Sequence, residues 1–296
     1  MRKLAQFSFF TALSGFILIV AGGLVTSHQA GLSVPDWPLS YGQWMPPMIG
    51  KIFWEHGHRM IASFVGFLTL TMSIWTHCIR GTSRELRGFS RILVELVILQ
   101  GVFGGLTVLY NLPHAVSIVH ASLGQIFFSA LCLFAYSVKC EVVPISFSIS
   151  DEKKPLLSKA FRIARITAII FLIQLFLGAA TRHMKHMHVA WTHAAFALVV
   201  VMHVVFVFLR VSNLQLQDKA PLRMATFLLS AIMLQVLLGV GSLGLTQFMQ
   251  RGPQPSTAQI WFTTFHQSLG AVLLASVLLL TLMLHKRLRS LSTKAC

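Results

Sequence analysis

The sequence predicts an all-α integral membrane protein with eight transmembrane helices. Hydrophobic residues occupy 55% of the 296 positions and charged residues 11%, whereas charged residues make up about a quarter of an average soluble domain. Each of eight apolar stretches reaches the roughly 20 residues that a helix needs to cross a bilayer. Backbone polar groups cannot stay unpaired in lipid, so these stretches should be helical. We expect the helices at 7–27, 55–78, 91–111, 115–138, 161–182, 188–210, 222–246 and 260–285.

Basic residues are concentrated on one predicted side of the membrane, and the formal net charge is +16. If the N-terminus is cytoplasmic, 19 of the 24 Lys and Arg residues fall in segments on the inner side. Because such a bias sets orientation, we expect both N- and C-termini to be cytoplasmic. The basic excess is therefore a topology signal, and we expect no nucleic-acid partner. The outer side keeps five cations, namely Lys51, Arg59, Arg182, Lys185 and Arg251.

The N-terminal span follows Met1-Arg2-Lys3 and so looks like a signal peptide, but we expect no cleavage. Its apolar run is long, and it ends in the pair Gly22-Gly23, which belongs to an internal repeat. No Arg- and Ser-rich transit peptide precedes it, which favours a bacterial cytoplasmic (inner) membrane over a mitochondrial one. The four cysteines lie in spans or on the predicted inner side, and there is no CxxCH motif, so any haem is bound non-covalently.

A short motif recurs near the ends of the odd-numbered spans. Gln-x-x-x-Gly followed by a small residue occurs at 100–105, 174–179 and 235–241, while the first span has Gly22-Gly23 with Leu18 in place of the glutamine. After each motif come an outer loop and a histidine near the start of the next span. Small residues let membrane helices approach closely, so packing alone is one explanation of the glycines. The four histidines are His58, His120, His193 and His266.

The repeat divides the chain into two similar halves. His120 and His266 both begin the sequence His-x-Ser-Leu-Gly, which pairs the second hairpin with the fourth and leaves the first to pair with the third. The repeating unit is thus four helices. We expect two pseudo-symmetric four-helix bundles, at residues 1–140 and 161–296, joined by a cytoplasmic linker at 141–160.

Histidines at one membrane depth point to metal centres inside the bundles. An ionisable residue within a span is a functional candidate by default, although a lone histidine is more often an interfacial or pore-lining group. Two imidazoles from different helices of a bundle can ligate one haem iron axially. Zinc is less favoured, because it usually takes three or four protein ligands and each half offers two. Haem propionates near the outer face would need cations there, although Lys51 and Lys185 fit ordinary loop solvation.

One carboxylate breaks the equivalence of the two halves. Glu55 lies three residues before His58, so both share a helix face. Ala190 and Thr263 hold the corresponding positions in the second half, and Ser117 holds that before His120. A carboxylate beside a cofactor can accept protons or stabilise positive charge. Pairing of Glu55 with Arg59 at the helix start is the alternative. If both halves bind a haem-like group, only the first has an acid or base beside it.

With these residues the chain resembles the haem A synthase family, membrane enzymes that convert haem O to haem A for haem-copper terminal oxidases. The matching segments span nearly the whole chain. They are Gly22-Gly23-Leu-Val-Thr26, the loop Gly31-Leu-Ser-Val-Pro35-Asp36-Trp37-Pro38-Leu39, Glu55-His-Gly-His58-Arg59, Gln100-Gly-Val-Phe-Gly-Gly-Leu-Thr107, Leu112-Pro113 with His120, and then His193 and His266.

The resemblance implies an oxidoreductase that oxidises a porphyrin methyl group of haem O to a formyl group through hydroxylated intermediates. It implies that His58 and His120 hold the iron of the substrate haem, that His193 and His266 ligate a haem B cofactor, and that Glu55 is the catalytic residue. Some members carry two cysteines in the first outer loop. Val34 and Ser40 stand about there, so this chain looks like the cysteine-free branch and a thiol-based role of the loop is excluded.

Two other functions share these pockets. A dihaem b-type, quinol-linked electron-transfer protein would also need paired histidines, and a non-enzymatic haem carrier or assembly factor would need no Glu55. We expect haem O, the lipid bilayer, the haem O-forming enzyme and oxidase assembly factors as partners. The oligomeric state stays open, with a homo-oligomer as one alternative.

Overall fold

The structure is a computed structural model that describes residues 1–143, 151–249 and 252–292. In this part of the chain eight helices are long and apolar enough to cross a membrane, which confirms the predicted all-α class and the eight spans. They are α1 (Arg2–Ser27), α2 (Gly50–Cys78), α3 (Arg84–Leu109), α4 (His114–Val142), α5 (Lys154–Met184), α6 (Met187–Ser212), α7 (Ala220–Leu243) and α8 (Thr257–Ser292). A 3-10 turn (Asp151–Lys153) precedes α5, and a π-helical turn (Gly244–Phe248) follows α7.

Most helices extend beyond the predicted spans at the end where basic residues cluster. Helix α3 begins at Arg84 because the Ser83 hydroxyl accepts a hydrogen bond from the Leu86 N–H and caps the helix. Helix α5 begins at Lys154 with a proline in its first turn, where the missing N–H costs nothing. Helices therefore enter the predicted 141–160 linker from both sides, and residues 144–150 of that linker lie outside the described residues.

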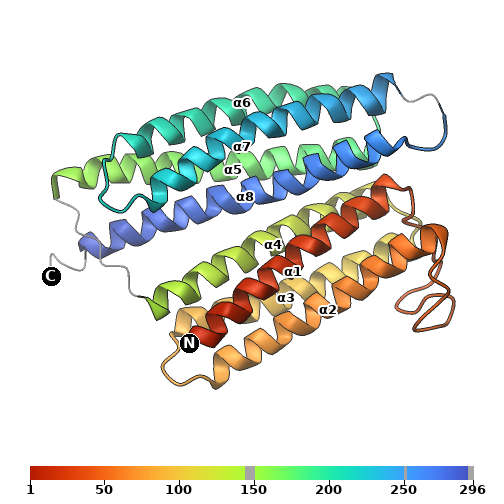
Figure 1. The fold of residues 1–296 in the computed structure, drawn as a ribbon, viewed down its shortest axis with the longest axis horizontal. Helices are drawn as coiled ribbons and strands as arrows, with labels where there is room; N and C mark the ends of the chain where they lie inside the picture. The colour runs from red at the N-terminus through yellow and green to blue at the C-terminus, as the bar shows by residue number, and fades with distance from the viewer. Residues whose placement is uncertain (144–150, 250–251, 293–296) are drawn as a thin grey trace.

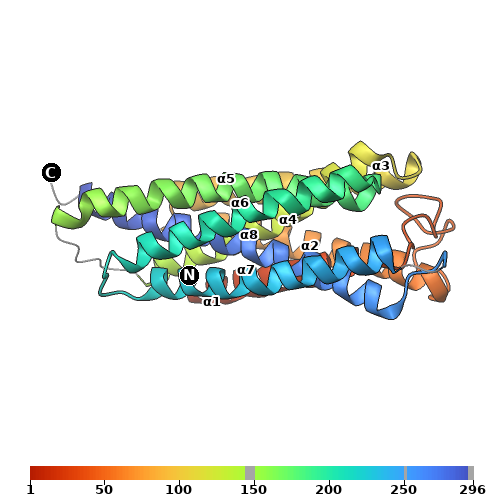
Figure 2. The same ribbon diagram turned by 90° about the horizontal axis from the view of Figure 1, so that it is seen from above.

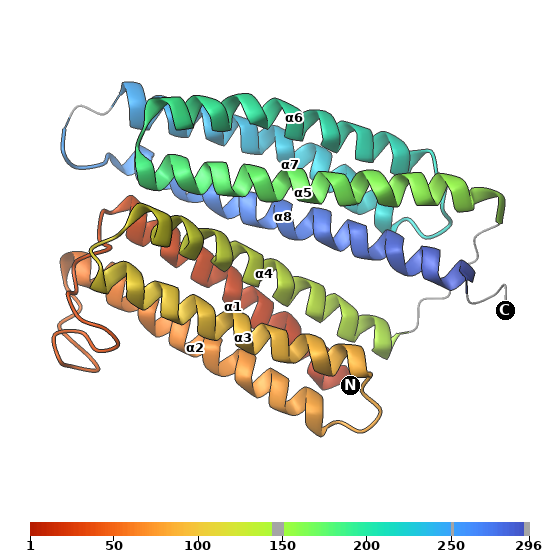
Figure 3. The ribbon, with the colours of Figure 1, turned by 180° about the vertical axis from the view of Figure 1, so that it is seen from behind.

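The helices form two groups of four that lie side by side (Figures 1 and 3). In the first group α1 contacts α2 and α4, and α3 also contacts both. In the second, α5 contacts α6 and α8, and α7 also contacts both. The groups meet where α8 packs on α1 and α4 and where α4 packs on α5; Figure 2 shows the second group from above. We call this contact the seam.

All helices run nearly along one axis, so the connections gather at two ends of the molecule. The N-terminus lies at the end that holds the α2–α3 and α6–α7 connections, and the loop between α1 and α2 lies at the opposite end (Figure 1). We call this opposite end, which holds the loops before α2, α4, α6 and α8, the outer end. The start of every even-numbered helix, where the four histidines stand, therefore lies at the outer end.

Each group has its own apolar core, and a small third cluster fills the seam. That third cluster consists of Ile19, Phe128, Ala271 and Ala275, from α1, α4 and α8. Lipid is as apolar as these side chains, so association inside a membrane relies on close packing and hydrogen bonds. At the outer end of the seam the Ser27 hydroxyl lies 3.0 and 2.9 Å from the hydroxyls of Thr263 and Thr264 on α8. These buried contacts join α1 to α8.

Candidate functional site

Every one of the four histidine rings lies against a glycine of the preceding helix. A Cβ atom built on Gly22, Gly104, Gly178 or Gly239 would stand 3.1, 3.2, 3.0 or 2.8 Å from the Cε1 atom of His58, His120, His193 or His266, respectively. Such distances are shorter than ordinary van der Waals contacts, so a side chain at these positions would displace the ring. The glycines therefore do more than bring helices together, because each leaves the space that an imidazole occupies.

The glutamine of the repeat holds the same histidine through its backbone. Nε2 of Gln100, Gln174 and Gln235 donates to the carbonyl oxygen of His120, His193 and His266 at 3.0, 3.1 and 3.0 Å. Gln and Gly stand four residues apart and so share a helix face. At His120, His193 and His266 this spacing therefore places the glutamine that bonds the histidine backbone one turn before the glycine that leaves room for the imidazole ring. In the first hairpin Leu18 replaces the glutamine and cannot make this bond.

The ring nitrogens differ in their surroundings. Nδ1 of His58, His120 and His193 is buried without a hydrogen-bond partner, although each histidine is half-buried as a whole. Nδ1 of His266 lies 3.1 Å from the carbonyl oxygen of Gln235. In all four contacts the edge of the ring that carries Cε1 faces the glycine, and Nδ1 lies slightly closer to it than Nε2.

The structure brings one histidine pair together. The ring centroids of His193 and His266 are 6.1 Å apart, and the ring planes are nearly perpendicular. Metal–imidazole bonds are about 2 Å long and an imidazole centre lies about 1 Å behind its nitrogen, so rings on opposite sides of one ion have centres about 6 Å apart. His58 and His120 interact electrostatically, but no ring contact joins them in the described part of the chain.

These observations fit a haem iron with two axial imidazoles better than a zinc ion. A ligating histidine usually donates its second N–H to a carbonyl or carboxylate, as Nδ1 of His266 does to Gln235. The described residues contain no group of three or more His, Cys, Asp or Glu that could hold a metal ion. A two-imidazole set leaves the other ligand positions to a planar macrocycle, which is how haem proteins bind iron.

Glu55 is almost completely buried and makes contacts on both carboxylate oxygens. Oε1 accepts a bond of 2.7 Å from Arg59, and Oε2 accepts one of 2.9 Å from the Val34 N–H. The expected pairing of Glu55 with Arg59 is therefore present, but its expected place at the helix start is wrong, because α2 begins at Gly50 and has no acidic residue in its first turn. The carboxylate stands one turn before His58 on α2 and also holds the outer loop.

Arg59 donates hydrogen bonds to several backbone carbonyl groups of the loop that connects α1 to α2. Its Nη1 donates to Asp36 and Leu39 at 2.7 and 2.9 Å, and its Nη2 donates to Val34 at 3.3 Å in addition to Glu55. These bonds use its donors on the protein itself. Arg59 thus stabilises the loop, and its terminal nitrogens are already engaged and less suited to bind a haem propionate.

Further contacts fasten this loop across the outer end of the first group. The Ser40 hydroxyl bonds Nδ1 of His56 at 2.7 Å, so His56, which points away from His58, holds the loop. The Trp37 indole lies directly on Gly105, where a Cβ would be 2.8 Å from the ring. Gly105 follows Gly104, which faces His120. Residues 28–49 therefore cross the outer end of the first group, and Trp37 packs on α3 beside the glycine that faces His120.

Sequence reasoning missed what several of these residues do. The roles of the glutamines and of Trp37 were not predicted, although the regular Gln–Gly spacing is a signal that could have suggested the first. Among the predicted outer cations, Lys51 and Lys185 are exposed and Arg251 lies outside the described residues. Arg182 lies in the last turn of α5, as expected for the outer side, and its side chain reaches across the seam to α1.

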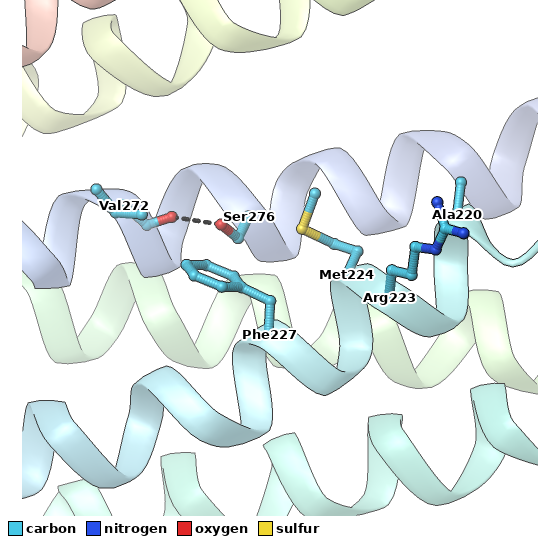
Figure 4. A pocket seen from close by; sticks show the side chains of 6 residues that line it. All are labelled: Ala220, Arg223, Met224, Phe227, Val272 and Ser276. Carbon is cyan, nitrogen blue, oxygen red and sulfur yellow. Dashed lines mark hydrogen bonds between the residues drawn. The ribbon is translucent and has the colours of Figure 1, made fainter.

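A cavity of about 480 Å³ lies elsewhere, between α7 and α8 (Figure 4). It is lined by Ala220, Arg223, Met224, Phe227, Val272 and Ser276. The Ser276 hydroxyl donates to the carbonyl oxygen of Val272 on its own helix. Ala220 begins α7, so the cavity lies toward the end that holds the α6–α7 connection. None of the four histidines lines it.

Known proteins share parts of this sequence. Residues 49–190 match a family model described as a cytochrome oxidase assembly protein. The match includes Glu55, His58 and His120 and ends before His193. Similar curated proteins named haem A synthase occur in Geobacillus kaustophilus, Exiguobacterium sp. and Shouchella clausii, at 27%, 24% and 26% identity over 62% of this chain.

The chain is similar to proteins of the haem A synthase family over 62% of its length. The aligned segments cover 57%, 59% and 60% of the length of these three relatives. The resemblance inferred from the loop and the Glu-x-x-His-Arg segment is therefore confirmed. This similarity does not by itself assign the second histidine pair, which lies beyond the matched family model.

We predict that filling the space beside a histidine destabilises the protein. Gly239→Ala puts a methyl group 2.8 Å from His266 and should cost about 1–3 kcal/mol of stability through overpacking. Gly101→Ala, which adds a methyl group where no atom lies within 4 Å, should be neutral or stabilising by up to about 1 kcal/mol. Thermal unfolding of both variants in detergent tests this. Equal stability of the two variants would contradict it.

We also predict an acid-sensitive loop. The backbone N–H groups of Gly42 and Tyr41 bond the carboxylate of Asp36 and hold its pKa below the ordinary value. Because the folded pKa is depressed, this stabilisation is present above the unfolded pKa of about 3.9 and disappears as the pH falls through the folded value. Amide exchange of Tyr41 and Gly42, corrected for intrinsic rates, should speed up below about pH 4.

Asp36→Asn should show the faster amide exchange already at neutral pH, because an amide oxygen replaces two carboxylate oxygens. Glu85→Gln, which alters a carboxylate in the first turn of α3 far from the loop, is the control and should leave exchange unchanged. Protection that is the same in wild type and Asp36→Asn at pH 7 would refute the role of Asp36.

Proposed function

We propose that this protein is a haem A synthase, which oxidises a porphyrin methyl group of haem O to a formyl group through hydroxylated intermediates. The position of Glu55 is the observation that carries the proposal. Glu55 is buried one turn before His58. The second half, residues 161–296, contains a single acidic residue, Asp218, which precedes α7 at the opposite end. Only the first half has an acid or base beside its histidines.

In this proposal the two halves have different tasks. Residues 1–140 bind the substrate, with His58 and His120 positioning the iron of haem O under the loop that carries Trp37. Residues 161–296 bind haem B between His193 and His266, whose 6.1 Å ring separation suits one iron. Haem B would supply one-electron transfer. The glycines and glutamines keep both histidine pairs oriented, and the loop limits the access of water to the first pair.

Glu55 would act on the methyl-bearing edge of the substrate. As an ionised carboxylate it can accept a proton from the reacting carbon or stabilise a cationic intermediate. Its contacts with Arg59 and Val34 fix the side chain before substrate arrives. A carboxylate has about four acceptor sites, so these two bonds leave capacity for the substrate.

The setting we propose is a bacterial cytoplasmic membrane, with the N- and C-termini inside. The concentration of basic residues at the end that holds the N-terminus supports this orientation. The haem O-forming enzyme and oxidase assembly factors are the partners that this reaction would require before and after it. A cytochrome oxidase assembly role is also what the description of the matching family model names.

We predict that Glu55→Gln keeps haem binding and loses haem A formation by at least about 100-fold, the usual contribution of a general acid or base. The amide keeps the size and one acceptor but not the charge. Ser40→Ala is the matched control, because it removes a loop contact without touching Glu55. Haem A made at a normal rate by Glu55→Gln would refute the role. An equal loss in Ser40→Ala would assign the effect to the loop.

The haems that co-purify with the protein test the function as a whole. Extraction and chromatography should yield haem B together with haem O, hydroxylated haem or haem A. Haem B alone, at two per chain, would favour a dihaem electron-transfer protein. Haem O that is bound but never converted in the presence of an electron acceptor would favour a carrier. A protein without bound haem would overturn the proposal.

A further inference from the structure

Arg182 lies in the last turn of α5 and crosses the seam to the first group of helices. Its Nη2 atom donates to the carbonyl oxygen of Gly23 at 2.9 Å and to the Ser27 hydroxyl at 2.6 Å. Ser27 in turn bonds Thr263 and Thr264 of α8. The guanidinium group is therefore fixed at the point where α1, α5 and α8 meet.

This half-buried cation has no carboxylate partner among the described residues. The described residues form two ion pairs, Arg59 with Glu55 and Arg287 with Asp218, and Arg182 takes part in neither. The remaining acidic residue of the outer end, Asp36, bonds backbone N–H groups of its own loop. Nε of Arg182 is buried and has no hydrogen-bond acceptor. A charge held this way is costly unless an anion from outside the chain compensates it.

The position of Arg182 indicates where such an anion would come from. Gly178, one turn earlier on α5, lies against His193. Gly23, whose carbonyl Arg182 contacts, lies against Thr264 and Gln267, which flank His266 on α8. The charge of Arg182 also acts on His266. Arg182 therefore stands beside the second histidine pair, on its outer side.

We propose that Arg182 binds a propionate carboxylate of the haem that His193 and His266 hold. The inference rests on the proposed function, because it requires a haem in the second half. The bonds to Gly23 and Ser27 orient the guanidinium, and Nε and Nη1 keep N–H donors for a charge-assisted bond to the carboxylate. Arg59 is less suited to this role, because both of its terminal nitrogens already bind the loop and Glu55.

The positive charge of Arg182 would also change the reduction potential of that haem. A fixed positive charge beside the haem favours the reduced iron, which carries one positive charge fewer. The effect is larger in a partly buried seam than in water. Arg182 should therefore raise the reduction potential of the haem in the second half.

Redox titration of the purified full-length protein with its bound haem tests the proposal. Arg182→Gln should shift the oxidised-to-reduced ratio at a fixed potential at least tenfold toward the oxidised form, equivalent to about 59 mV for one electron. Lys185→Asn is the matched control. It removes an exposed cation three residues away, and asparagine tolerates the left-handed backbone of that position. The control should leave the ratio unchanged within twofold.

A haem without free carboxylates separates anchoring from a structural role. After haem removal, wild type and Arg182→Gln are reloaded with haem or with its dimethyl ester. Wild type should bind haem at least about tenfold more tightly than the ester, because only the free carboxylate forms a charge-assisted bond with the guanidinium group, and Arg182→Gln should lose most of this preference. Equal affinities of wild type for the two forms, or a preference for haem that Arg182→Gln keeps, would overturn the proposal. A variant that takes up neither form has lost the pocket itself, and this would also overturn it.

The outcomes separate this inference from the proposed function. Wild-type protein that purifies without haem would refute the proposed function. Wild-type protein with haem B whose redox behaviour is unaffected by Arg182→Gln would refute only the role of Arg182.

Discussion

The close approach of an imidazole to a glycine on the preceding helix is the contact on which both histidine pairs depend. Inside a bundle of closely packed helices the neighbouring helix must leave space for such a ring. From a single helix face Gly104 leaves this space for the His120 ring, and Gln100 donates a hydrogen bond to the His120 backbone carbonyl. Because the same arrangement recurs along the chain, the rings stand at one depth near the outer end.

The two groups of helices share this arrangement, but the residues that surround their histidine pairs differ. In the first group the loop of residues 28–49 covers the outer end and is held by Glu55 and Arg59. In the second group two histidine rings lie close together, and the nearby charge is the cation Arg182. The first pair thus has the ion pair of Glu55 and Arg59 beside it, whereas the second has a cation without a carboxylate partner among the described residues. This is the electrostatic difference that we expect between a site of reaction and a site of electron transfer.

Helix number and the equivalence of the four histidines could be predicted from the sequence, because both follow from regular patterns of apolar and small residues. Helix ends were predicted less well, since helices such as α3 continue into the aqueous layer, where hydropathy carries no signal. Contacts across the loop and the seam, such as Glu55 with Val34 or Arg182 with Gly23, join residues far apart in sequence. No local pattern encodes these pairings, and they required the structure.

The central place of α8 has a consequence for how the protein is assembled in a cell. α8 supplies His266, and it also supplies Thr263 and Thr264, which bind Ser27 of α1 across the seam. α8 is synthesised last of the eight helices. The hydroxyl group of Ser27 on α1 can therefore bond Thr263 and Thr264 only after α8 has been made. The first histidine pair can form while translation continues, whereas the second pair and the seam are completed only when the C-terminal helix has been inserted.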